Sequence, residues 1–145
     1  MKNDETTRRM KEITVPAVLA ELNQVIAFVS RELEDFHCPT AAQMQIELAV
    51  EELYVNIANY AYQPEDGDAT VRLRVEEDPL QVTIQFLDSG KPYNPLEKPD
   101  PDVALPAKER EIGGLGIFLV KKNMDEIAYE YKDGKNVLTV KKKME

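Results

Sequence analysis

The sequence predicts an α+β fold, a two-layer sandwich in which a mainly antiparallel (mixed) sheet carries helices on one face. Several short segments alternate apolar and polar residues and are joined by tight turns, which is the period of half-buried strands in hairpins. Two longer segments repeat apolar residues every three or four positions, as amphipathic helices do. Strands joined by hairpins, with a few helices beside them, are typical of two-layer α+β domains.

The N-terminal part of the chain is expected to hold a short strand and a helix. Residues 8–15 are assigned to the strand. Pro16 suits the first turn of a helix that ends near Phe36, because proline lacks the N–H that a first turn leaves unpaired. The apolar stripe of this helix is Val18, Leu22, Val25, Val29 and Leu33.

A second helix is expected over about residues 41–62, and its two faces differ. Thr40 and Gln43 have the spacing of a capping box at its start. At about 100° per residue, one side gathers an apolar stripe of Ile46, Val50, Leu53, Ile57 and Ala61. A narrow polar arc between apolar borders holds Gln45, Glu52, Asn56 and Asn59. This arc is either the wall of a cleft or a polar edge with an i,i+4 hydrogen bond.

The C-terminal half alternates hairpins with a loop and a short helix. Strands are expected over residues 71–76, 80–88, 127–131 and 137–140. Between the hairpins, residues 91–112 show no sustained periodicity and contain Pro92, Pro95, Pro99, Pro101 and Pro106. A loop of this length in a small domain is usually functional. The glycine-rich stretch I-G-G-L-G-I-F-L-V then opens a helix that ends near Met124.

Composition narrows the class of protein. A chain of 145 residues is expected to form a single domain, over residues 1–145. The net charge of -9 argues against nucleic-acid binding, which requires a basic surface. Cys38 is the only cysteine, so an intramolecular disulfide is excluded and a reducing compartment is favoured. With neither a signal peptide nor a membrane-spanning run in view, the chain is expected to be cytoplasmic and to have no membrane partner.

Asp88 and the glycines after the loop could carry chemistry, although each has a structural alternative. Asp88 ends a strand before Ser-Gly, which is either a functional carboxylate or a strand-ending turn. Gly113, Gly114 and Gly116 would let phosphates approach the unpaired N–H groups of a helix N-terminus, or would only form a hinge. The spacing excludes a P-loop and a dinucleotide-binding fingerprint.

In combination, these segments resemble the N, G1 and G2 boxes of the GHKL ATPase superfamily, which includes histidine kinases. The chain carries E-x-x-x-N on a helix, D-x-G after a strand, a long loop, and G-x-G opening a helix. The segments D-S-G-K-P-Y-N-P-L-E-K-P-D-P-D and I-G-G-L-G-I-F-L-V-K-K-N-M-D-E are similar to those of the bacterial anti-sigma-factor serine/threonine kinases of partner-switching systems. The resemblance covers roughly residues 15–142 and implies the GHKL (Bergerat) ATP-binding fold.

The resemblance also implies a role for each residue of these boxes. Glu52 would be the general base, and Asn56 would offer its amide oxygen to Mg²⁺ and contact the nucleotide. Asp88 would accept a hydrogen bond from the adenine amino group, with Gly90 leaving room for the base. Residues 92–112 would be the ATP lid. The other expected nucleotide contacts are Asn59, Lys108, Arg110, Gly113, Gly114, Leu115 and Gly116.

The activity implied by the resemblance is that of an ATP- and Mg²⁺-dependent serine/threonine protein kinase. Its acceptor would be a STAS-domain antagonist, its second partner a sigma factor or another output protein, and relatives often form homodimers. The alternative is a catalytically weak, nucleotide-sensing module that sequesters the output protein. Two positions depart from better-known members: Tyr60 stands where many carry histidine, and Asn136 lies near the usual place of a nucleotide-contacting threonine.

Overall fold

A computed structural model describes residues 10–62, 65–97 and 114–144. One five-stranded sheet has the order β1-β2-β3-β5-β4, and its four strand pairs are all antiparallel. The strands are β1 (Lys11–Pro16), β2 (Asp68–Glu76), β3 (Gln81–Asp88), β4 (Glu126–Lys132) and β5 (Lys135–Lys143). The helices are α2 (Leu22–Asp35), α3 (Thr40–Tyr60) and α4 (Gly114–Asn123), with 3-10 turns η1 (Leu19–Glu21) and η2 (Pro95–Glu97).

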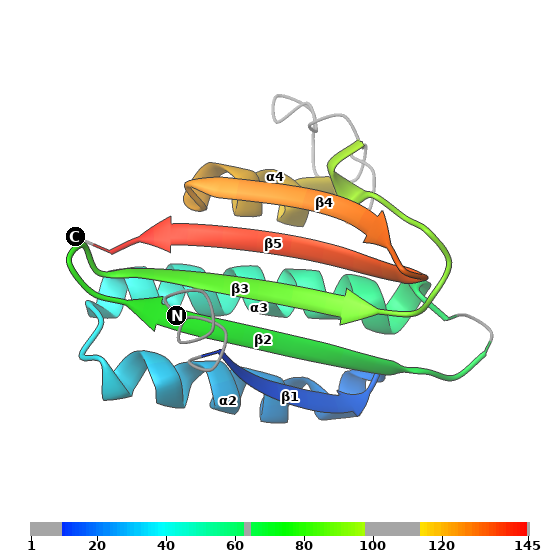
Figure 1. Ribbon diagram of the computed structural model, residues 1–145, viewed down its shortest axis with the longest axis horizontal. Coiled ribbons are helices and arrows are strands. Elements are labelled where there is room, and N and C mark those ends of the chain that lie inside the picture. The colour runs from blue at the N-terminus through cyan, green and yellow to red at the C-terminus, as the bar shows by residue number, and fades with distance from the viewer. Residues whose placement is uncertain (1–9, 63–64, 98–113, 145) are drawn as a thin grey trace.

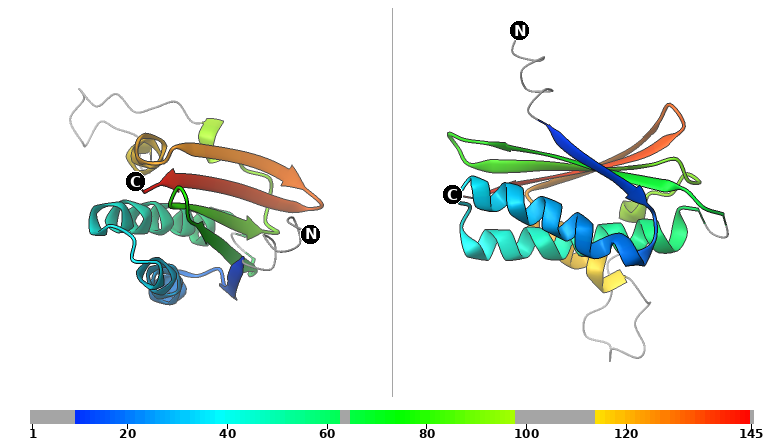
Figure 2. Two further views of the ribbon diagram at one scale, coloured as in Figure 1. Left: turned by 60° about the vertical axis from the view of Figure 1, so that its left-hand side comes forward. Right: turned by 90° about the horizontal axis from the view of Figure 1, so that it is seen from below.

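The three helices lie on one face of the twisted sheet (Figures 1 and 2). Helix α2 lies behind β1 and β2, α3 behind the centre of the sheet, and α4 behind β4 and β5 (Figure 1). Between the layers, the core is built from aliphatic side chains of both, with the fully buried Tyr54 and Phe86 as its largest members. The predicted two-layer α+β fold is confirmed. Within the described segments, no helix combines the length and apolar character needed to cross a bilayer.

The first predicted helix begins later than the sequence indicated. Pro16 is the last residue of β1, where it pairs with Asp68, and the regular helix starts only at Leu22. The hydroxyl of Tyr54 donates to the carbonyl oxygens of Pro16, at 3.0 Å, and Val18, at 2.7 Å. These bonds from α3 occupy the carbonyls of the connection, which therefore stays extended up to Val18.

The predicted capping box at the start of α3 is wrong. The N-cap residue is Pro39, without a side-chain cap bond, so Thr40 already lies in the first turn. The carbonyl of Pro39 accepts the backbone N–H of Gln43 at 2.9 Å. The side-chain amide of Gln43 donates instead to Glu47 at 3.3 Å, one turn further along the helix.

Both predicted hairpins are present, and their register positions the site. Asp133 and Gly134 have φ angles of 56° and 77°, the left-handed pair that a two-residue hairpin turn with the twist of the strands requires. This turn sets β5 against β4, and β5 in turn pairs with β3. At the end of β3, Asp88 therefore lies directly opposite Asn136.

Candidate functional site

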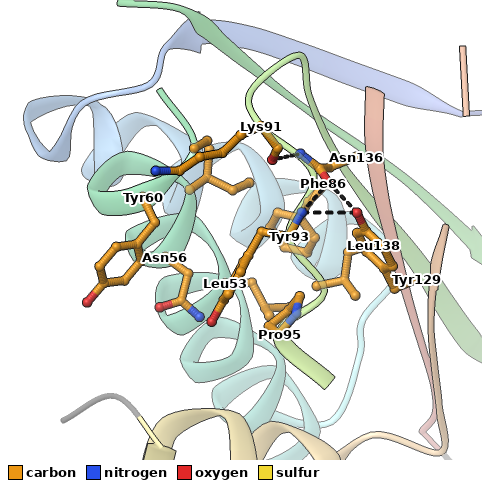
Figure 3. Close-up of a pocket in the computed structure, with 12 residues that line it drawn as sticks. Leu53, Asn56, Tyr60, Phe86, Lys91, Tyr93, Pro95, Tyr129, Asn136 and Leu138 are labelled. Atoms are coloured by element: carbon orange, nitrogen blue, oxygen red, sulfur yellow. Dashed lines mark hydrogen bonds between the residues drawn. The ribbon is translucent and has the colours of Figure 1, made fainter. Parts of the chain in front are cut away.

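A pocket lies between the second half of α3 and the inner face of the sheet (Figure 3). Its walls are mainly apolar, and asparagine, lysine and tyrosine groups bring polar atoms to its edge. The lining residues are Leu53, Asn56, Ile57, Tyr60, Ala61, Phe86, Lys91, Tyr93, Pro95, Tyr129, Asn136 and Leu138. Apolar walls with a few convergent polar groups are typical of small-molecule sites.

Tyr93 narrows this pocket by crossing it from the sheet to the helix. Its backbone N–H donates to Oδ1 of Asn136 on β5 at 3.1 Å, and its ring centroid lies 6.5 Å from that of Tyr60 on α3 (Figure 3). The remaining free volume is about 40 Å³, enough for a few water molecules but not for a purine. The pocket in this form is therefore too small for a flat base, and Tyr93 is one of the side chains that narrow it.

Asp88 lies at the C-terminal end of the central strand β3 and bonds to the pocket residue Asn136. It is only 6% exposed. Its Oδ1 accepts the backbone N–H of Gly90 and Nδ2 of Asn136, both at 2.9 Å. These two donors, one from the backbone after β3 and one from a side chain on β5, together hold the carboxylate in one orientation.

Gly90 has a packing role that the sequence did not indicate. A Cβ atom at this position would lie 2.2 Å from the carbonyl oxygen of Ala61, which is backbone and cannot step aside. The next residue, Lys91, donates its N–H to that same oxygen at 3.1 Å. The segment after β3 is thereby fastened to the end of α3, which closes one side of the pocket.

Glu52 lies on α3 one helical turn before Asn56, and its side chain is half-buried. Burial raises the pKa of its carboxyl above the ordinary value of 4.5, and the negative charge of the neighbouring Glu51 raises this pKa further. A carboxylate whose ionised form is disfavoured by its surroundings takes up a proton more readily. This is the property that a general base needs.

Gly116 brings the first turn of α4 against Glu52. A Cβ atom at Gly116 would lie 2.0 Å from Cδ of Glu52, so only glycine permits this approach. The first-turn N–H groups of a helix have no intrahelical partner and carry partial positive charge. Helix α4, which starts at Gly114, therefore places a phosphate-compatible N-terminus next to a candidate base.

Asn59 is placed elsewhere than the sequence prediction expected. It is absent from the lining of the pocket and lines a separate hollow of about 600 Å³ with Pro16, Tyr62 and Asp68. Along α3, Asn59 points away from the direction of Leu53 and Tyr60, but it lies only about 20° from the direction of Glu52, which is also absent from the lining of the pocket. The expected nucleotide contact of Asn59 therefore stays a prediction.

The other predicted residues fall into two groups. Asn56 lines the pocket, Asp88 stands behind it, and Glu52 and Gly116 meet beside Asn56. Lys108, Arg110 and Gly113 lie outside the described residues, as does most of the expected lid. Leu115 belongs to the first turn of α4, but its side chain also lies outside the described part.

Sequence reasoning missed the contributions of Tyr93 and Tyr129. Tyr129 lies on β4, and its hydroxyl donates to Oδ1 of Asn136. A usable signal existed for Tyr129, since Ile127, Tyr129 and Tyr131 are large apolar or aromatic residues at every second position and so share one face of a strand. The conformation of Tyr93 had no local signal, because partners on distant strands and on α3 determine it.

The side chains that could coordinate a metal ion in this site are few, which suits an ion such as Mg²⁺ that phosphates mainly coordinate. Among these residues, no group of three or more His, Cys, Asp or Glu side chains is placed to bind a metal ion. Mg²⁺ does not require such a cage, because it keeps several waters and binds through few protein oxygens together with substrate phosphates. Asn56 supplies one amide oxygen of the suitable kind at the edge of the pocket.

Gly116→Ala is expected to impair any chemistry that depends on the position of Glu52 while sparing the fold. The new methyl group would push the flexible end of Glu52 aside, whereas alanine favours helix by up to about 1 kcal/mol. A displacement near 1 Å costs about 100-fold in rate, so we expect a loss of that order with an unchanged or higher melting temperature. Gly134→Ala is the matched control: its Cβ would meet open space, its φ of 77° makes it mildly destabilising, and its rate should stay normal. A Gly116→Ala protein whose rate equalled that of wild type would contradict the placement of Glu52.

Comparison with known proteins agrees with this geometry. The sequence model of the histidine kinase-like ATPase domain family matches residues 15–142 of this chain. The serine-protein kinase RsbW of Listeria monocytogenes is 32% identical over 101 residues, which cover 66% of this chain and 63% of that protein. The serine/threonine-protein kinase BtrW of Bordetella bronchiseptica is 27% identical over 95 residues, which cover 66% of each chain. The chain thus spans just under two thirds of the length of these curated relatives.

Solved structures show the same fold at low sequence identity. The chain matches one from the SiaB-SiaC complex of Pseudomonas aeruginosa with a TM-score of 0.64 and 20% identity, over 97% of this chain and 95% of that one. It matches the structure of the RsbU and RsbW domains of a Mycobacterium tuberculosis protein with a TM-score of 0.65 and 16% identity, over 93% of this chain and 32% of that one.

Proposed function

We propose that this chain, which belongs to the histidine kinase-like ATPase domain family, binds Mg-ATP between α3 and the sheet and transfers the γ-phosphate to a serine or threonine of another protein. The observation that carries the proposal is the meeting of Glu52 with Gly116, one turn from Asn56. A base, a metal-binding oxygen and a helix N-terminus are the parts that phosphoryl transfer requires.

The adenine base would lie in the apolar pocket, after displacement of the Tyr93 ring. Leu53, Ile57 and Phe86 offer apolar surface to the faces of a purine. Asp88 would accept a hydrogen bond from the exocyclic amino group of the base. A carboxylate accepts hydrogen bonds and donates none when it is ionised, so it favours an amino group over a carbonyl group at this position.

At the other end of the site, Glu52 would accept the proton of the attacking hydroxyl. The unpaired N–H groups at the start of α4 would orient the phosphates, which glycine leaves accessible at Gly114 and Gly116. Asn56 would hold Mg²⁺ through its amide oxygen, and the ion would neutralise phosphate charge when bound. Residues 92–112 would cover the nucleotide, with Lys108 and Arg110 near the γ-phosphate.

The acceptor would be a STAS-domain antagonist, and a sigma factor or other output regulator would be the second partner. The kinases named among the relatives support a protein acceptor, and the net charge of -9 disfavours nucleic acid. We further propose that the protein works in the cytoplasm as a homodimer. A chain with one cysteine is suited to a reducing compartment.

Incubation with γ-labelled ATP, Mg²⁺ and the STAS-domain protein encoded nearby tests this function. Label on a serine or threonine of the acceptor is the expected result. If the chain bound ATP but left the acceptor unlabelled, the kinase function would be wrong, and a nucleotide-sensing binding module would take its place.

The pH profile of the transfer offers a further prediction. Glu52 acts as a base only when ionised, so the rate should fall below its raised pKa. Removing the negative charge of Glu51 makes ionisation of Glu52 easier and lowers that pKa. Glu51→Gln is therefore expected to move the acid limb of the rate profile to lower pH, by a modest amount because Glu51 is exposed and salt screens its charge.

Initial rates across the acid range at low and high salt measure this shift. Glu130→Gln removes an equal charge from an exposed position on β4 and serves as the control. A limb that stayed in place in Glu51→Gln at low salt, or that moved equally in the control, would refute the role of Glu52 as the titrating group.

A further inference from the structure

Asn136 uses its whole hydrogen-bonding capacity within the protein. An asparagine side chain can donate two hydrogen bonds and accept two. Nδ2 of Asn136 donates to Oδ1 of Asp88 and to the carbonyl oxygen of Lys91, both at 2.9 Å. Oδ1 accepts from the backbone N–H of Tyr93 at 3.1 Å and from the hydroxyl of Tyr129. Three of these partners appear around Asn136 in Figure 3.

The orientation of this amide follows from its partners. The carboxylate of Asp88 and the carbonyl of Lys91 only accept, and the backbone N–H of Tyr93 only donates. A flipped amide would set its oxygen against two other oxygens and its nitrogen against an N–H. Since Asn136 is 6% exposed, water does not compensate such mismatches readily. The network therefore has one stable arrangement.

The partners of Asn136 belong to parts of the chain with different tasks. Asp88 is the carboxylate proposed to bind the adenine, whereas Lys91 and Tyr93 begin the segment that crosses the pocket. Neither group is fixed by its own strand alone, because β3 ends at Asp88. Asn136 on β5 is the side chain that bonds to both.

We propose that Asn136 is a positioning residue for adenine recognition, which fixes the carboxylate of Asp88 and the backbone of Lys91 and Tyr93 and makes no hydrogen bond of its own to the adenine. The inference rests on the proposed binding of ATP in this pocket. It differs from the role expected at this position from the family resemblance, where a threonine touches the nucleotide. Asn136 acts through Asp88, so its loss should weaken discrimination between adenine and guanine, not only affinity.

Titration of the full chain with ATP and with GTP, for wild type and variants, tests the proposal. Asn136→Leu removes the four side-chain bonds of Asn136 and should weaken ATP binding by about 10-fold, the weight of one hydrogen bond to a charged group. GTP binding should weaken less, so the preference for ATP narrows. Asn136→Thr keeps a hydroxyl that can donate to Asp88 and should restore most of the preference. Tyr129→Phe removes one bond to Oδ1 of Asn136 but leaves both of its donor bonds, so it should narrow the preference less than Asn136→Leu does.

Coupling to Asp88 separates positioning from general destabilisation. In an Asp88→Asn background, Asn136→Thr and Asn136→Leu should have no further effect on the ATP-to-GTP preference, because residues of one network are not additive. Thr139→Val is the matched control: it removes the 3.3 Å bond from Gln85 between the same strands on the other face of the sheet. It should lower the melting temperature without changing the preference.

The outcomes are distinct. Wild type that bound no ATP would overturn the proposed function and this inference together. Wild type that bound ATP, with variants of Asn136 that weakened ATP and GTP equally or added fully to Asp88→Asn, would overturn the inference alone. Should Asn136→Leu fail to fold, Asn136→Thr and Tyr129→Phe in both backgrounds decide the matter by the same criteria.

Discussion

Glu52→Gln is expected to abolish phosphate transfer while ATP still binds. The amide has nearly the shape of the carboxylate but cannot accept the proton of the acceptor hydroxyl. General-base catalysis contributes about 100- to 10,000-fold, so a loss of at least about 100-fold is expected. The fold should tolerate the change, because burial and Glu51 already disfavour the charged form of Glu52, as its raised pKa shows. Labelled transfer and calorimetric titration with Mg-ATP give the two readouts.

Glu51→Gln is the matched control for this experiment. It removes the same charge from the next position of α3, where the side chain is exposed. Well above the acid limb of the pH profile, its rate should lie within about threefold of wild type, as for a residue without a part in proton transfer. A Glu52→Gln protein that transferred phosphate at the normal rate would refute the assignment of Glu52 as the general base. A Glu52→Gln protein that lost ATP binding as well would show that Glu52 already contributes to nucleotide binding.

Asp88→Asn is expected to weaken ATP binding itself. An asparagine can keep Oδ1 as the acceptor for Gly90 and Asn136, so the end of β3 should stay in place. Its second group becomes a donor facing the amino group of adenine. Loss of a hydrogen bond to a charged group is worth about 1.5–3 kcal/mol, which is about 10- to 100-fold in Kd. Calorimetric titration measures this, and transfer at saturating ATP should recover in part.

Asp125→Asn controls for the loss of a carboxylate at a strand end. Oδ2 of Asp125 accepts the backbone N–H of Lys143 at 2.6 Å, away from the pocket, so the change removes an equal charge without touching the proposed site. ATP affinity should be normal in this control. Normal affinity in Asp88→Asn, with the control also normal, would remove Asp88 from the site.

Local patterns predicted most of the fold. Alternation in β2 and β3 and the turn at Asp133 and Gly134 depend on neighbours in sequence, and these elements were placed within a few residues. The start of α2 was misplaced because Tyr54, more than thirty positions away, bonds to the carbonyls of Pro16 and Val18. A capping box was likewise expected at Thr40 because Thr40 and Gln43 have the right spacing. That spacing does not reveal that Pro39 occupies the N-cap position.

The sequence predicted those parts of the candidate site that depend only on residue spacing within one helix. Glu52 and Asn56 sit one helical turn apart in any helix, and the resemblance to GHKL ATPases built on them is confirmed by the family match over residues 15–142. Asn59 was assigned to the same site from the polar arc, and in the structure it lines a separate hollow next to the direction of Glu52, so its assignment stays a prediction. The links among Asp88, Asn136 and Tyr129 join three strands, and the register that creates them exists only in the folded sheet.

A crystal structure with Mg²⁺ and a non-hydrolysable ATP analogue tests the central claim most directly, namely that Asp88 and Glu52 stand at the two ends of one nucleotide site. The expected result has the amino group of adenine within hydrogen-bonding distance of Asp88, the Tyr93 ring displaced, and the γ-phosphate between the start of α4 and Glu52. A nucleotide bound elsewhere, with the Tyr93 ring still across the pocket, would contradict the account.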